Sequence, residues 1–196
     1  ISTLSLQESS QGAHALASCG FLDATLARDM AEHVQQLVSA GFDASIDDWC
    51  SLCWALCASG CYHDALFRKT FVVAKVYPGL SDETSCRLYE VHLALKAFHR
   101  EAYQGYELPA DVAKRIRAVY RKHGKTHVGR ASEKLHRDFA EVVRGVADDP
   151  VSRQHRTDDG LVVDLAVVPR RGHRATVLIE FDGPHSLGRS LESGGA

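Results

Sequence analysis

Apolar residues recur at helical spacing through the first 125 residues, and this periodicity is the strongest constraint on the fold. Ser45 and Ser81 each precede acidic residues and suit the N-cap of a helix, while Pro109 suits a first helical position. The sequence therefore predicts a series of helices. The periodic stretches are Leu4–Ala17, Leu26–Val38, Trp49–Cys61, Ala65–Val76, 82–104 and 110–123.

Two segments of this helical region match each other at one constant spacing. A period of about 40 residues is typical of stacked helix pairs, in which one pair cannot bury its own apolar face without a neighbour. We therefore predict an α-helical repeat domain, a solenoid of helix pairs, over residues 1–125. The matching positions are Ala15 and Ala55, Leu16 and Leu56, Gly20 and Gly60, Leu26 and Leu66, and Arg28 and Arg68.

Charge is distributed unevenly along a chain whose formal net charge is only −2. Residues 1–90 carry 5 basic and 11 acidic side chains, whereas residues 91–196 carry 18 and 14. Nine of the basic residues fall between Lys114 and Arg137, where Glu133 is the single acid. Such a cluster attracts polyanions by counterion release, although a solvated helix face beside an acidic neighbour is the alternative. No apolar run is long enough to span a membrane.

Four of the six cysteines fall within twelve residues, at Cys50, Cys53, Cys57 and Cys61. Their offsets place all four on one stripe of a helix, with Cys50 and Cys61 roughly 16 Å apart along its axis. One zinc ion needs its sulfur ligands about 2.3 Å away, so a straight helix cannot supply all four. We therefore predict small core residues in a reducing compartment and no metal centre.

After Pro150 the pattern of the sequence changes from helical periodicity to apolar runs rich in β-branched residues. Two apolar runs, Leu161–Val168 and Ala175–Asp182, flank the turn-forming segment Pro169–His173 and predict a β-hairpin after a helix over 132–143. If Val168 faces Arg174, three carboxylates share one face, because strand side chains alternate. These carboxylates are Asp164, which then faces Leu178, together with Glu180 and Asp182. A turn of even length would move Asp164 to the other face and remove the cluster, and the alternative is that Asp164 and Asp182 only lie at strand ends or cap turns.

Two segments combine apolar runs with acidic residues and glycine: Asp159-Gly160-Leu161-Val162-Val163-Asp164-Leu165-Ala166 and Val177-Leu178-Ile179-Glu180-Phe181-Asp182-Gly183-Pro184-His185. Together they resemble the RAP domain. This resemblance implies a PD-(D/E)xK nuclease-like fold, here partial, placed after a helical repeat array as in FAST-kinase-like organellar proteins. The Trp49–Phe67 stretch is similar to those repeats. We therefore expect an α+β protein with a repeat domain over 1–125, a truncated RAP-like domain over 126–185 and a disordered tail over 186–196.

The same resemblance implies a role with organellar RNA. We predict a protein that binds or stabilises rRNA as a component or assembly factor of the mitochondrial ribosome, with plastids as the alternative location. Its partners would be RNA and neighbouring ribonucleoprotein subunits. Since residue 1 is not Met, it is expected to follow a removed targeting segment, or the chain is a fragment. The predicted phosphate contacts are Lys114, Arg115, Arg117, Arg121, Lys122, Lys125, Arg130, Arg170, Arg171 and Arg174.

Two alternative functions remain open from the sequence. The first is a magnesium-dependent endoribonuclease, in which Asp164 and Glu180 hold the ion that activates water. The nuclease motif has a lysine where this chain has Asp182, so we expect neither catalytic residues nor a bound metal. The second is a structural subunit that binds protein through the acidic first 90 residues.

Overall fold

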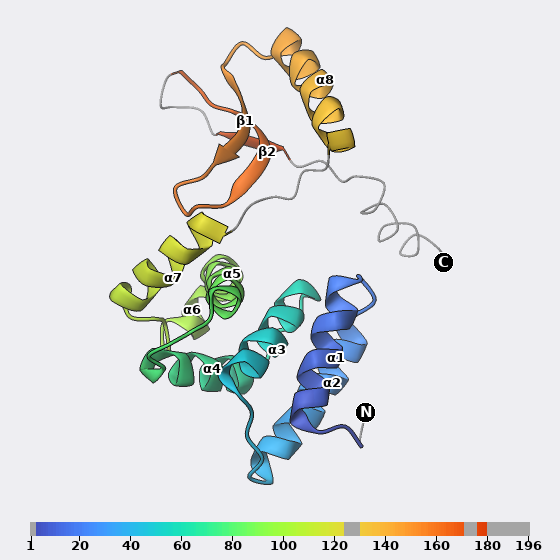
Figure 1. Ribbon diagram of the computed structural model, residues 1–196, viewed down its shortest axis with the longest axis vertical. Coiled ribbons are helices and arrows are strands. Elements are labelled where there is room, and N and C mark those ends of the chain that lie inside the picture. Colours follow the sequence, from blue (N-terminus) through green and yellow to red (C-terminus); the bar gives the residue numbers. More distant parts are fainter. Residues whose placement is uncertain (1–2, 124–129, 171–175, 180–196) are drawn as a thin grey trace. The chain divides into compact units, whose positions relative to one another are not determined.

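The computed structural model describes residues 3–123, 130–170 and 176–179, and it confirms the α+β class (Figure 1). The chain divides into two units, residues 1–123 and 124–196. The described part of the first unit is helical, and that of the second combines one helix with a small antiparallel sheet. The predicted disordered tail over 186–196 lies outside the described residues.

The first unit is built from successive helices that pack in sequence order. α1 packs on α3, α3 on α5 and α5 on α7, while α2 contacts α4. The stretch predicted as one helix over 82–104 is broken at His99, whose backbone leaves the helical region at φ −135° and ψ 37°. The helices are α1 (Leu6–Ser18), α2 (Ala24–Ser39), α3 (Ile46–Ala58), α4 (Asp64–Val76), α5 (Asp82–Phe98), α6 (Arg100–Tyr103) and α7 (Ala110–His123).

The turns after α1 and α3 have the same hydrogen bonds at the positions that match in the sequence. Gly20 and Gly60 adopt φ values of 76° and 69°, a left-handed conformation that glycine tolerates best. The next residue in each turn donates its backbone N–H to the carbonyl of Leu16 or of Leu56, at 2.8 Å in both cases. This is the Schellman arrangement. The matching positions thus have equivalent local structure, and α2 ends in the same kind of turn, in which Phe42 donates to the carbonyl of Leu37 at 3.0 Å.

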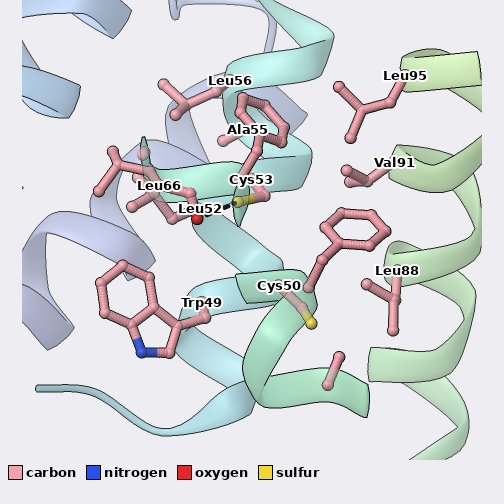
Figure 2. Close-up of a cluster of buried hydrophobic side chains, with 14 of the residues drawn as sticks. Trp49, Cys50, Leu52, Cys53, Ala55, Leu56, Leu66, Leu88, Val91 and Leu95 are labelled. Carbon is pink, nitrogen blue, oxygen red and sulfur yellow. Dashed lines mark hydrogen bonds between the residues drawn. The ribbon is translucent and has the colours of Figure 1, made fainter. Parts of the chain in front are cut away.

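The core of the first unit lies between α3, α4 and α5 (Figure 2). Trp49, Leu52 and Leu56 of α3 are fully buried, together with Leu66 of α4 and Leu95 of α5. Burying each large apolar side chain stabilises the fold by roughly 1.5–3 kcal/mol. α3 is therefore the central helix of the unit.

The prediction that the cysteine stripe belongs to the core is confirmed for Cys50 and Cys53, which are fully buried. Cys53 Sγ lies 3.1 Å from Thr70 Oγ1 of α4, and Figure 2 shows Cys53 among the neighbouring core side chains. Burial raises the pKa of Cys50 and of Cys57 to about 12, so both remain neutral thiols at physiological pH. Cys57 and Cys61 are half-buried at the end of the stripe.

The second unit contains α8 (Arg130–Val146) and the strands β1 (Val151–Arg156), β2 (Val162–Val167) and β3 (Val177–Ile179). The strands pair antiparallel in the order β1-β2-β3. Leu165 of β2 is fully buried against Ala140 and Val143 of α8. The expected helix and antiparallel hairpin strands are present, as α8 and the pair β2–β3, and β1 is an additional strand that the sequence analysis did not predict. β1 was missed because its sequence, VSRQHR, has a single apolar residue and no alternation.

The expected hairpin register is also corrected. Ala166, and not Asp164, pairs with Leu178, because Leu165 pairs with Ile179 and Val167 with Val177. Each residue of β3 therefore pairs with a β2 residue two positions further along the chain than expected. Such a shift keeps each side chain on the same face of the sheet, since strand side chains alternate with a period of two.

Candidate nucleic-acid interface

α7 carries the described part of the predicted phosphate-binding segment, and its apolar side fixes its orientation. Val112 and Ile116 are buried, and the helix packs on α5. The ring of Tyr120 lies 5.1 Å from that of Tyr89 in α5, measured between centroids. Residues at i, i+4 and i+8 lie along one side of a helix. The apolar side of α7 therefore faces α5, and its opposite side is exposed.

Four of the predicted cations are exposed on that opposite side: Lys114, Arg115, Arg121 and Lys122. At 3.6 residues per turn these four side chains fall within an arc of about 120°, centred on the exposed Ala118. They span about 12 Å along the helix axis. We call these four residues the α7 cationic face. The acid of α7, Asp111, is exposed on the same side, one turn before Lys114 and Arg115, in the first turn, where the helix dipole favours a negative charge.

Glu90, an acidic residue near the packed side of α7, forms its contacts within the first unit. Glu90 of α5 accepts a hydrogen bond from Trp54 Nε1, at 2.5 Å from Oε2. Burial is the main reason that the pKa of Tyr120 is raised to about 12. The nearby charge of Glu90 and a hydrogen bond to Glu90 raise it further. Glu90 is thus held between α3 and α7, on the side of α7 that faces α5.

The fifth predicted cation of α7, Arg117, is only half-exposed. Its Nε is buried and has no hydrogen-bond partner in the described part of the chain. Arg117 therefore lies at the edge of the α7 cationic face and is not counted in it.

The remaining predicted RNA contacts are described only in part. Arg170 is exposed beyond the end of β2 in the second unit, where its backbone N–H donates to Asp149 Oδ1 at 3.2 Å. Arg130 begins α8, but its side chain lies outside the described residues. Lys125, Arg171 and Arg174 also lie outside them.

Of the three predicted carboxylates, only Asp164 is described. It is half-buried in β2, and the flanking pairs Arg153–Leu165 and His155–Val163 place Gln154 of β1 opposite it. Gln154 has a φ of 46°, the one positive φ among the described residues other than glycine. Glu180 and Asp182 lie outside the described residues. Within residues 3–123, 130–170 and 176–179, no group of three or more His, Cys, Asp or Glu side chains could hold a metal ion.

The structure contains a hollow in the first unit that the sequence did not indicate. A cavity of about 340 Å³ opens where the turn after α3 meets the end of α5. The lining residues are Cys57, Gly60, Cys61, Tyr62, Phe67, Ala94, Phe98 and His99.

Comparisons with protein-family models, with curated proteins and with solved structures found no match for this chain. Among the described helices, none combines the length and the apolar character that crossing a membrane requires.

Proposed function

We propose that this chain is an organellar RNA-binding protein that binds or stabilises rRNA, as a component or assembly factor of the mitochondrial ribosome. The observation that carries the RNA-binding part is the α7 cationic face. Its four exposed cations lie on one side of a helix whose other side is fixed against α5. RNA presents a dense row of phosphates, and releasing its condensed counterions supplies free energy for binding.

The α7 cationic face suits phosphate binding without base recognition. Long, flexible lysine and arginine side chains on a straight helix reach phosphate oxygens, and such contacts set the position of a protein on RNA without reading sequence. Structured RNA is recognised largely through its backbone shape and its 2′-hydroxyl groups. We therefore propose a folded or duplex region of rRNA as the partner of α7.

The placement in an organelle rests on the resemblance of residues 159–185 to the RAP domain and on the equivalent helix pairs of the first unit. The matching N-caps of α1 and α3 at Ser5 and Ser45, 40 residues apart, together with matching turns at the ends of these helices, support a repeat architecture for residues 1–125. The described helix and antiparallel strands of the second unit are elements that a partial RAP-like domain would contain. Plastids remain the alternative location.

Binding of a labelled RNA hairpin to the whole chain tests the proposal. The double variant Lys114→Glu, Lys122→Glu should bind roughly tenfold more weakly or worse at physiological salt, because two phosphate contacts become repulsions. The matched control is Arg28→Glu, Lys96→Glu, which makes the same change in net charge at two exposed positions of the same unit. Equal weakening in the two proteins would show that net charge alone acts, and would contradict a defined binding face.

A further inference from the structure

The cavity beside Phe98 combines an apolar interior with an exposed aromatic ring. Phe67 forms part of its wall and is fully buried, whereas Phe98 is 81% exposed. Phe98 therefore offers a flat apolar surface to a ligand at the edge of the cavity. The volume of about 340 Å³ falls within the range of small-ligand pockets.

Stacked rings hold one wall of this cavity. The imidazole of His99 lies on the ring of Tyr62, with centroids 4.1 Å apart and planes 13° from parallel. Tyr62 in turn stacks on Phe67, with centroids 5.3 Å apart and planes at 19°. The Tyr62 hydroxyl is anchored, because it donates to Asp64 Oδ1 at 2.8 Å and lies 2.9 Å from the Tyr106 hydroxyl. The stack therefore makes this wall rigid, beside the exposed ring of Phe98.

A second hollow adjoins the first and supplies a cation. It shares Phe98 and His99 with the cavity, and Arg100 contributes to its lining, as does Glu101. Arg100 is exposed and follows His99 directly in the chain. A ligand with an aromatic ring in the first hollow and an anionic group in the second would meet a suitable side chain in each. A nucleotide unit of RNA has this composition.

We propose that the cavity beside Phe98 binds an unpaired nucleobase of single-stranded RNA. The base stacks on Phe98 between the apolar walls formed by Cys57 and Ala94, and Arg100 contacts its phosphate. Aromatic stacking on unpaired bases is a common way for proteins to bind single strands. This inference rests on the proposed RNA binding and adds unpaired nucleotides to the RNA that the chain recognises.

The test compares two oligonucleotides of about twelve nucleotides, a length within the usual site size of single-strand binders. One is oligoadenylate, and the other has the same backbone with every base replaced by an abasic ribose. Fluorescence anisotropy gives the affinity of the whole chain for each. Wild-type protein should prefer oligoadenylate by roughly fivefold or more, the usual effect of one stacked base.

Phe98→Ala should abolish that preference, because it removes the stacking surface. Phe21→Ala is the matched control, since Phe21 is 74% exposed on the same unit and does not line the cavity. It should keep the preference. Ala94→Leu, which fills the cavity, should act like Phe98→Ala. A preference that persists in Phe98→Ala would overturn the inference, as would equal binding of both oligonucleotides by wild-type protein.

Failure of this inference can be separated from failure of the proposed function. The double variant Lys114→Glu, Lys122→Glu should weaken both oligonucleotides by the same factor and leave their ratio unchanged. If wild-type protein binds neither oligonucleotide nor the RNA hairpin, the proposed function fails. If both oligonucleotides bind with equal, salt-sensitive affinity, RNA binding stands and the base site alone is refuted.

Discussion

Ser5 and Ser45 cap α1 and α3 in the same way, at matching positions of the two helix pairs. Ser5 Oγ accepts the backbone N–H of Glu8 at 3.2 Å, and Ser45 Oγ accepts that of Asp48 at 3.1 Å. In each case the serine hydroxyl donates to the carboxylate of the same acidic residue, at 2.7 Å and 2.6 Å. The two helix pairs therefore begin with equivalent caps as well as ending their first helices in equivalent turns.

Removing either cap should destabilise the first unit by a similar amount. Ser5→Ala and Ser45→Ala should each lower the free energy of unfolding by about 1 kcal/mol, the usual value of an N-cap. Urea denaturation followed by circular dichroism measures this. Ser39→Ala is the control, since Ser39 is exposed on α2 and caps no helix N-terminus. A loss for Ser45→Ala no larger than that for Ser39→Ala would contradict the role of the cap.

The left-handed backbone of Gln154 predicts that replacing this residue with glycine will not destabilise the sheet. A residue with a side chain is strained at a φ of 46°, by about 1 kcal/mol, and glycine is not. Gln154→Gly should therefore leave the sheet as stable as before or more stable. His155→Gly, in regular strand conformation at the next position, should destabilise it by about 1 kcal/mol.

Hydrogen exchange of the β2 amides reports the stability of this sheet directly. The two glycine variants share a strand and differ by one position, so a general weakening of β1 cannot explain a difference between them. Equal loss of protection in both would mean that Gln154 is not held in a strained conformation.

The buried thiols predict a loss of stability at alkaline pH. Burial raises the pKa of Cys50 to about 12 in the folded chain, from an ordinary value of 9.0. Folding therefore favours the neutral thiol. The contribution of this preference to the free energy of unfolding is complete below pH 9 and is lost as the pH rises toward 12. At pH 10.5 the loss is on the order of 2 kcal/mol for one such group.

Chemical denaturation of wild type and Cys50→Ala at pH 7.5 and 10.5 measures this contribution. The stability difference between the two proteins should shrink at the higher pH, because the variant lacks the group that ionises on unfolding. Cys19→Ala is the control, since Cys19 is exposed. A stability difference that does not change between the two pH values would contradict the effect.

Periodicity predicted much of the first unit because helices bury residues at a regular spacing. The N-caps at Ser45 and Ser81 were predicted correctly, since a capping serine bonds an N–H in the first turn of its own helix and this local effect is visible in the sequence. The break at His99 was not predicted. At this break the ring of His99 stacks on that of Tyr62, which precedes α4 in the chain. The periodicity of a single helix cannot show a contact between residues so far apart in the sequence.

In the second unit the β2 strand was predicted from its apolar run, whereas β1 was not. β1 is stabilised by pairing with β2, and cross-strand partners are not visible in a strand's own sequence. Charge clustering located the α7 cationic face. It could not show which cations share a side, because that depended on Val112 and Ile116 being the buried residues.

The central claim is that the α7 cationic face binds RNA phosphates, and the salt dependence of binding tests it most directly. The affinity of the whole chain for a labelled RNA hairpin is measured over a range of salt concentrations, for wild type and for a variant with Lys114, Arg115, Arg121 and Lys122 all changed to Gln. The slope of log affinity against log salt should fall by up to about 3–4 in the variant, nearly one for each phosphate that is no longer neutralised. An unchanged slope, with RNA binding intact, would show that phosphates contact some other surface and would contradict the account.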